Sequence, residues 1–160
     1  MTIDFAKRPN RIPWPPILFV AAGAAAFFLQ RAIPTGGLLP DWLMAFGEAL
    51  MALGIAFDFW AMGVMILAGA NILPNRGAGQ LVTRGPFAMT RNPIYLGNTL
   101  LLTGIGLAYS ALWFLPFALL AAVLVDRLAI RREEKHLALR FGEEWSAYAA
   151  TTPRWLKWLF

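Results

Sequence analysis

The sequence predicts an all-α protein: an integral membrane bundle of four transmembrane helices followed by a C-terminal amphipathic helix at the membrane interface. Of the 160 residues, 59% are hydrophobic and only 14% are charged, against about 25% charged in typical soluble domains. Four apolar stretches approach or exceed the roughly 20 helical residues that cross a hydrocarbon core. They cover residues 15–30, 42–70, 94–110 and 111–125. Residues 1–160 are expected to form a single domain, with residues 1–61 containing the N-terminal arm, the first span and the start of the second.

The first span follows a charged, proline-rich arm that ends near Pro16. No small-residue cleavage site is followed by a soluble domain, so we expect this span to stay in the mature protein rather than to be a signal peptide. The second apolar stretch is the longest. A helix rises about 1.5 Å per residue, so this stretch must tilt or project past the membrane.

The loop at residues 71–92 is the longest interval between spans that is not hydrophobic, and ordered loops of this length are commonly functional. Asn92 and Pro93 are typical of a helix N-cap and first helical residue, which predicts that the third span begins there. Tyr109 and Ser110 predict a tight turn between spans three and four. These two spans should therefore form an antiparallel hairpin.

Span four continues into a charged and then amphipathic stretch, which we expect to lie on the bilayer surface. Its apolar positions are Leu137, Phe141, Trp145 and Tyr148. Small residues allow close approach of helices in membranes. We therefore expect the span glycines to be packing contacts, namely Gly54, Gly63, Gly69, Gly104 and Gly106.

The basic residues indicate the orientation. With the N-terminus in the cytoplasm, every lysine and arginine except Arg31 falls on the inner side, as the positive-inside rule requires. Those residues are Lys7, Arg8, Arg11, Arg76, Arg84, Arg91, Arg127, Arg131, Arg132, Lys135, Arg140, Arg154 and Lys157. Both termini should be cytoplasmic. The net charge of +5 is thereby explained without nucleic acid. The absence of cysteine and the single histidine argue against a metal site.

The hairpin brings the loop segment 80–92 close to the charged residues after span four, which is the only dense polar cluster in the sequence. Seven residues make almost two helical turns, so Arg127 should share a face with Glu134, and Asp126 should share the adjacent face with Glu133. Ion pairs at a helix exit would explain such a cluster without any function.

Asp58 lies within span two, where a charge is costly unless it is paired, protonated or next to water. Its partner could be Arg91 or Arg127, or it could bond to Asn98 or Thr99. His136 is expected to be an exposed helix residue rather than a catalytic base.

Several linked motifs resemble the isoprenylcysteine carboxyl methyltransferase and phospholipid methyltransferase family. The motifs are Leu81-Val82-Thr83 with Gly85-Pro86-Phe87, then Arg91-Asn92-Pro93-Ile94-Tyr95-Leu96-Gly97, then Glu133-Glu134, and finally Phe141-Gly142-Glu143-Glu144-Trp145 with Tyr148. The resemblance marks residues 62–157 as a catalytic region. It implies an integral membrane enzyme that binds S-adenosylmethionine between the loop, the hairpin and the last helix.

The family's cofactor contacts carry over by matched position. They correspond to Gln80, Leu81, Val82, Phe87, Asn92, Pro93, Ile94, Tyr95 and Glu133. Two positions depart from the prenylcysteine enzymes, which usually have histidine where this chain has Asn92. Their substrate-binding arginine aligns near Ala129, which Arg127 and Arg131 flank. The acceptor is therefore left open.

The expected chemistry is methyl transfer to a lipid-like acceptor. The start of span three and Arg91 could bind the cofactor carboxylate, while Glu133 or Glu134 binds a cationic part. The candidate catalytic residues are Arg91, Arg127, Glu134 and Asp58, with the acids as proton acceptors for an amine substrate. A prenylcysteine-like carboxylate is the leading acceptor, and a phospholipid amine or a small thiol is the alternative. A nicotinamide-dependent membrane reductase and a non-enzymatic binding protein are further alternatives. The location is expected to be the bacterial inner membrane, with a cytoplasmic active site.

Overall fold

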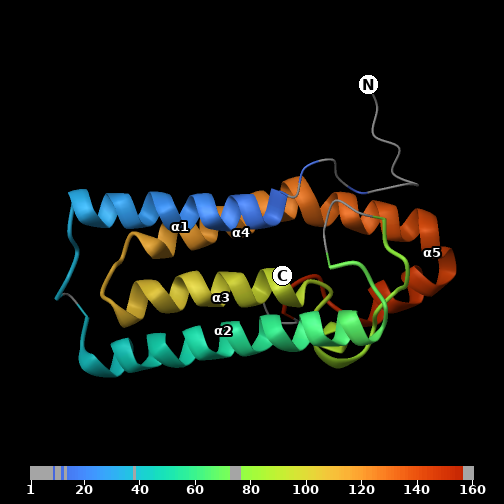
Figure 1. Cartoon of the computed structure of the whole chain (residues 1–160), viewed down its shortest axis with the longest axis horizontal. Helices are drawn as coiled ribbons and strands as arrows, with labels where there is room; N and C mark the ends of the chain where they lie inside the picture. Colours follow the sequence, from blue (N-terminus) through green and yellow to red (C-terminus); the bar gives the residue numbers. More distant parts are fainter. Residues whose placement is uncertain (1–8, 10–11, 13, 38, 73–76, 157–160) are drawn as a thin grey trace.

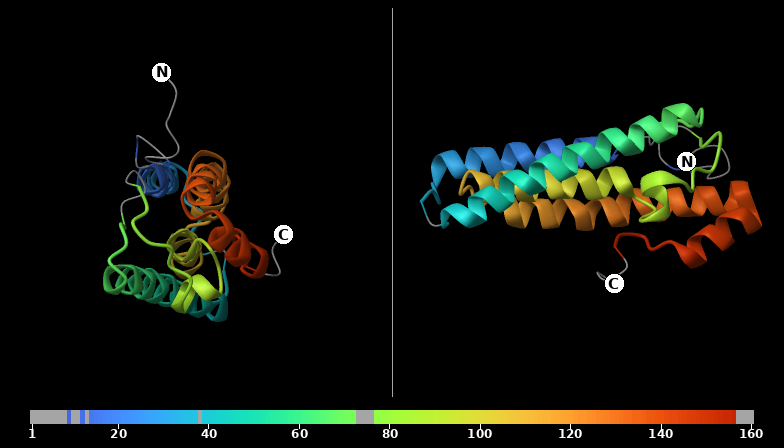
Figure 2. Two further views of the ribbon diagram at one scale, coloured as in Figure 1. Left: turned by 90° about the vertical axis from the view of Figure 1, so that its right-hand side faces the viewer. Right: turned by 90° about the horizontal axis from the view of Figure 1, so that it is seen from below.

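The computed structural model describes residues 9, 12, 14–37, 39–72 and 77–156, and every regular element within these ranges is helical. Figures 1 and 2 show the helices packed side by side in a bundle, with one of them continuing along its axis into a further helical rod. In chain order the elements are α1 (Trp14–Ala32), α2 (Asp41–Leu67), the 3-10 helix η1 (Gly85–Ala88), α3 (Pro93–Ala108), α4 (Phe114–Val125), the π-helix η2 (Asp126–Ile130) and α5 (Arg131–Thr151). The prediction of an all-α bundle is confirmed.

Two of these helices, α1 with 19 residues and α2 with 27, are long and apolar enough to cross a membrane. Only 22% and 11% of their most apolar windows are buried. Large apolar side chains face outward, for example Val20 at 72% and Leu67 at 83% exposure. Such surfaces suit a lipid environment, because soluble proteins rarely expose apolar patches of this size. The helices α3, with 16 residues, and α4, with 12, are shorter, so four spans stay a prediction.

The helices α2 and α3 pack closely because glycines face each other across the contact. A Cβ atom on Gly54 would lie 2.6 Å from the Gly97 carbonyl oxygen, and one on Gly104 would lie 2.7 Å from the Gly47 carbonyl oxygen. Real Cβ atoms do not approach so closely, so glycine is needed at these positions. Gly54 and Gly104 are therefore confirmed as packing contacts. Gly63 is not, since a Cβ there would meet no atom of the described residues within 4 Å.

The sequence also predicts packing contacts at Gly106 and Gly69. A Cβ on Gly106 would lie 3.1 Å from side chains at the start of α4, which confirms a packing contact. Gly69 has no such neighbour and instead adopts a φ of +67° just after α2. The amides of Gly69 and Ala70 donate to carbonyls in the last turn of α2, at 2.9 Å each. Gly69 therefore ends a helix rather than packing against one.

The turn after α3 forms the predicted hairpin. Ser110 has a φ of +49°, and the amide of Ala111 donates to the Gly106 carbonyl oxygen at 2.8 Å. This turn extends through Trp113, so α4 begins at Phe114 rather than at residue 111. As a result, the start of α3 and the end of α4, which are both predicted to be cytoplasmic, lie at the same end of the bundle, as Figure 1 shows.

The rod that follows α4 does not lie as one interfacial helix. Its first half continues the line of α4, and Gly142, with φ +51° and ψ −116°, then reverses the chain within α5 (Figure 1). Trp145 and Tyr148 were predicted on the bilayer surface, but they are 7% and 8% exposed. They are buried because the reversal packs them against the loop before α3. Among the basic residues used to predict orientation, Lys7, Arg8, Arg11, Arg76 and Lys157 lie outside the described residues.

Candidate active site

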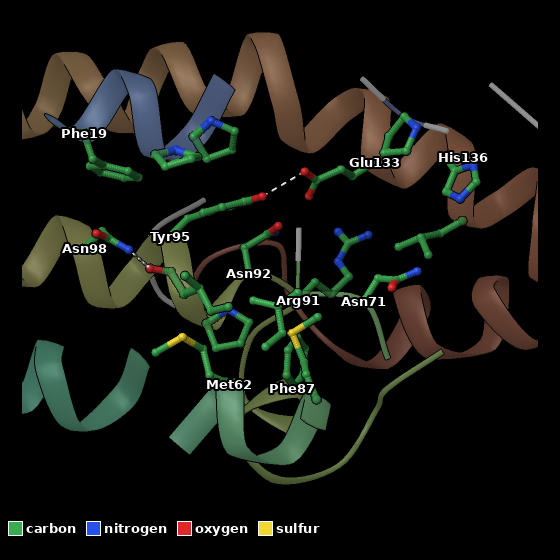
Figure 3. A pocket seen from close by; sticks show the side chains of 18 residues that line it. Phe19, Met62, Asn71, Phe87, Arg91, Asn92, Tyr95, Asn98, Glu133 and His136 are labelled. Atoms are coloured by element: carbon green, nitrogen blue, oxygen red, sulfur yellow. Dashed lines mark hydrogen bonds between the residues drawn. The ribbon is translucent and has the colours of Figure 1, made fainter. Parts of the chain in front are cut away.

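A cavity of about 360 Å³ lies where the loop before α3 and the start of α5 meet one end of the bundle. Its volume is within the range of about 300–1,000 Å³ that small-molecule sites occupy. Figure 3 shows side chains from α1, α2, α3 and α5 converging on it. Phe19, Met62 and Met65 form an apolar side, and polar groups of Arg91, Tyr95 and Glu133 contribute to the rest. The cavity is therefore amphiphilic.

A smaller cavity of about 140 Å³ adjoins the first and is lined by the loop and the reversed half of α5. The two share wall residues, namely Met65, Asn71, Phe87, Arg91, Glu133 and Leu137. Together they form one elongated site with Arg91 and Glu133 at the junction.

All the residues expected to bind the cofactor line one of these two cavities. Phe87, Asn92, Pro93, Ile94, Tyr95 and Glu133 line the larger cavity. Gln80, Leu81 and Val82 line the smaller one, which Phe87 and Glu133 also border. Residues separated by up to 53 positions in the sequence thus surround a common space.

Of the four candidate catalytic residues, only Arg91 lines a cavity. Arg91 lines both cavities. Glu134 lines neither and forms an ion pair with Arg91, with 3.1 Å between Oε1 and Nη1. Arg127 is exposed and lines neither cavity. Asp58 also lies outside both cavity linings, at the contact between α2 and α3.

Glu133 presents its carboxyl group to the cavity. The Tyr95 hydroxyl donates a hydrogen bond of 2.8 Å to its Oε1, drawn as a dashed line in Figure 3. Burial raises the pKa of Glu133 from 4.5 to about 7, and the Tyr95 hydrogen bond opposes that rise. An ionised carboxyl group is therefore costly here without a ligand, and a cationic ligand would stabilise it.

The predicted helical faces around this glutamate are wrong by about one residue. Arg154 bridges Asp126 and Glu134, at 3.5 Å and 2.5 Å, whereas Glu133 lines the cavities. The cause is the π-helix at Asp126–Ile130, which contains more residues per turn than an α-helix. Eight residues, rather than seven, therefore separate side chains on one face.

Arg91 is held at the junction of the cavities from two sides. Its guanidinium carbon lies 5.6 Å from the centre of the Trp145 ring, within reach of a cation–π interaction. Its Nη1 contacts Glu134, but its Nε is buried and has no hydrogen-bond partner among the residues that the structure describes. A partly buried guanidinium whose Nε points a donor into the interior suits an anionic ligand, which satisfies that donor.

The turn before α3 is fixed by the C-terminal segment. The Arg91 amide donates to the Pro153 carbonyl oxygen at 2.9 Å. The Thr90 hydroxyl and Asn92 Nδ2 both donate to the Arg154 carbonyl oxygen, at 3.0 Å and 2.8 Å. Asn92 is the N-cap residue of α3, as predicted, but its side chain makes no capping hydrogen bond and instead donates through Nδ2 to this segment. Pro93 is confirmed as the first helical residue.

His136 is buried at 1% exposure, which contradicts the expectation that it is exposed. Its Nε2 accepts a 3.0 Å hydrogen bond from the Ala78 amide, and Asn71 Nδ2 donates to the Gly77 carbonyl oxygen at 2.7 Å. Both side chains line the larger cavity, so they tie the start of the loop segment to its wall. Helical spacing from Glu133 could have revealed this, since residues three apart share a face.

Asp58 has none of the four predicted partners. Asn98 donates to the Ile94 carbonyl oxygen and Thr99 donates to the Tyr95 carbonyl oxygen, both at 2.8 Å. Asp58 Oδ1 is buried and accepts no hydrogen bond from the residues described, and it lies where a side chain on Gly97 would be. The glycine therefore makes room for the carboxyl group.

Comparison with known proteins identifies the family. The family model described as phospholipid methyltransferase matches residues 42–144, which is more than half of the chain. The chain belongs to the phospholipid methyltransferase family. The match extends from the start of α2 into α5 and includes all the expected cofactor contacts. Membership indicates a membrane methyltransferase, in agreement with the motifs.

Two curated proteins are similar over part of the chain. The nickel-cobalt-cadmium resistance protein NccN of Alcaligenes xylosoxydans xylosoxydans is 33% identical over 84 residues, covering 52% of this chain and 39% of that protein. The cobalt-zinc-cadmium resistance protein CzcN of Cupriavidus metallidurans is 35% identical over 84 residues, covering 52% and 38%. The alignments thus span less than two fifths of each relative. No solved structure matches.

Proposed function

We propose that this chain transfers a methyl group from S-adenosylmethionine to a lipid-like acceptor in the membrane, in the manner of isoprenylcysteine carboxyl O-methylation. The observation that carries the proposal is the convergence of all the expected cofactor contacts on two adjoining cavities. At their junction lie Arg91 Nε, which no described residue hydrogen-bonds, and the buried Glu133 carboxyl group; this pair fits a ligand that carries both an anionic and a cationic group.

Different residues bind different parts of the cofactor. Arg91 and the first amides of α3 bind its carboxylate, because a helix N-terminus and a guanidinium both favour an anion. Glu133 binds a positively charged part, and Phe87 and Tyr95 contact the adenine. The cofactor supplies an activated methyl group on a sulfonium. The protein contributes position and exclusion of water, which can be worth about 7–11 kcal/mol.

The acceptor occupies the apolar side of the larger cavity, between Phe19 of α1 and Met62 of α2. It enters laterally from the bilayer, while the cofactor enters from the cytoplasm of a bacterial inner membrane. A carboxylate acceptor is already ionised at neutral pH and needs no base. Neither Glu134 nor Asp58 lines a cavity, and this supports an acceptor that carries no proton to remove. A phospholipid amine is the second candidate, favoured by the family match.

The test has two steps with purified protein. Titration calorimetry should detect binding of S-adenosylmethionine but not of reduced nicotinamide dinucleotide; the reverse result would favour a reductase, and no binding of either would favour a non-enzymatic protein. Labelled methyl groups should then transfer to a prenylcysteine analogue. Phosphatidylethanolamine and a small apolar thiol serve as competing acceptors, and exclusive labelling of either would replace the carboxylate.

A further inference from the structure

Glu134 lies between two arginines that compete for it. Arg154 approaches with two nitrogens, at 2.9 Å from Nε to Oε1 and at 2.5 Å from Nη2 to Oε2. Arg91 makes a single contact of 3.1 Å, to Oε1. A two-pronged guanidinium–carboxylate pair is the stronger geometry, so Arg154 is the main partner of Glu134.

Arg91 is therefore only partly neutralised. Its side chain is 16% exposed and borders both cavities, and within the described part of the chain its Nε has no hydrogen-bond partner. Asp126 contacts Arg154 and Arg131, at 3.5 Å and 2.9 Å, rather than Arg91. The cluster of Arg91, Asp126, Arg131, Glu134 and Arg154 holds three positive and two negative charges, so one positive charge is left over.

We propose that Arg154 is a positioning residue: it occupies Glu134 and thereby leaves Arg91 available to bind the carboxylate of the cofactor. This inference rests on the proposed function. Without the Arg154 side chain, both oxygens of Glu134 become available to Arg91, which turns away from the cavities into a two-pronged pair. Arg154 lies beyond residue 144, where the family match ends. A side chain outside the matched region thus controls one inside it.

The contribution of the side chain can be separated from that of the backbone. The C-terminal segment holds Thr90, Arg91 and Asn92 through the carbonyl oxygens of Pro153 and Arg154. A substitution of the Arg154 side chain retains these bonds. Arg154→Gln is therefore expected to fold. Its effect on ligand binding measures the contribution of the Arg154 side chain to the ion cluster.

The experiment is a double-mutant cycle, read as the dissociation constant of S-adenosylmethionine for the purified full chain. Arg154→Gln is expected to weaken binding about tenfold, because Glu134 then captures Arg91. Adding Glu134→Gln removes the competing charge, so the double variant should return to within about threefold of the unaltered chain. A purely structural role for Arg154 would make the double variant at least as weak as the single one.

Two further variants complete the design. Arg131→Gln is the matched control, because Arg131 is 51% exposed and contacts Asp126 rather than Glu134; its affinity should be unchanged. Arg154→Lys, which keeps the charge but makes a one-pronged contact, should fall between the unaltered chain and Arg154→Gln. Unchanged affinity in Arg154→Gln, or no recovery in the double variant, overturns the inference. Absence of binding by the unaltered chain overturns the proposed function instead.

Discussion

The cavity wall and the ion cluster behind it contain neighbouring glutamates in different environments. Glu133 faces the cavities, accepts a hydrogen bond from neutral Tyr95, and has a pKa raised to about 7 by burial. Glu134 turns away and contacts two guanidinium groups. Glu133 can therefore respond to a bound cation, whereas the charge of Glu134 is already compensated. The direction of a side chain, rather than its place in a motif, therefore decides whether it meets a ligand.

The largest expected effect separates these two acids. Glu133→Gln should weaken S-adenosylmethionine binding about a hundredfold, or about 2.7 kcal/mol, because the site loses its buried negative charge. Glu134→Gln should leave the affinity within about threefold of the unaltered chain, because Glu134 lines neither cavity and removing its charge leaves Arg91 free to bind the cofactor carboxylate. Titration calorimetry on both variants measures the difference, and equal losses would remove the distinction between the two regions.

A second prediction concerns the contact that holds the cavity wall in place. Tyr95 lies on α3 and Met62 on α2, so the wall depends on the packing of these helices. Gly97→Ala should lower the free energy of unfolding by about 1–3 kcal/mol, because the new methyl group collides with Asp58 Oδ1 and the Gly54 carbonyl oxygen.

Gly63→Ala is the matched control for that substitution. It lies on the same helix as Gly54 in open space, and alanine is the better helix former by about 0.5–1 kcal/mol, so stability should hold or rise. Thermal unfolding in detergent compares the two variants. Equal stability of both would show that the close approach of α2 and α3 is not essential.

The third prediction concerns the pH dependence of cofactor binding, which depends on the ionisation of Glu133. Cofactor binding should tighten about tenfold between pH 6 and pH 8, because a cationic group binds the ionised form of Glu133, whose pKa is about 7. Without ligand the sign is reversed: the folded chain retains a proton that an unfolded carboxyl group releases near pH 4.5, so stability falls as pH rises towards 7.

Tyr95→Phe sharpens this test. The Tyr95 hydrogen bond lowers the pKa of Glu133, so its removal should move the midpoint of the binding profile to higher pH. In Glu133→Gln the profile between pH 6 and pH 8 should be flat. A profile that is the same in all three proteins would assign the pH dependence to another group.

The smallest expected effect on cofactor binding is that of Asp58→Asn. Asp58 lies outside both cavities, so the affinity should stay within about twofold of the unaltered chain. Turnover with the labelled methyl group is the informative measurement. Loss of turnover at normal affinity would support the catalytic role predicted from the sequence, and full activity would limit Asp58 to packing between α2 and α3.

The sequence by itself determined the helical class, the apolar helices and the family. Long apolar runs such as that around α2 have few alternatives to a helix in a membrane, because every backbone polar group must be satisfied internally. The motif from Arg91 to Gly97 and the Glu133-Glu134 pair identified the region of the site. The residues of the loop and of α3 that the family pattern marks as cofactor contacts line the two cavities, and their binding role stays a prediction.

The tertiary structure decided which way the side chains point. The π-helix after α4 shifts the faces of α5, so Asp126 and Glu134 share the partner Arg154, and of these three neighbouring acids Glu133 is the one that lines the cavities. The reversal at Gly142 buries Trp145 and returns Arg154 to the turn before α3. Neither change follows from helical periodicity, because each depends on a local departure from α-helical geometry that distant contacts stabilise.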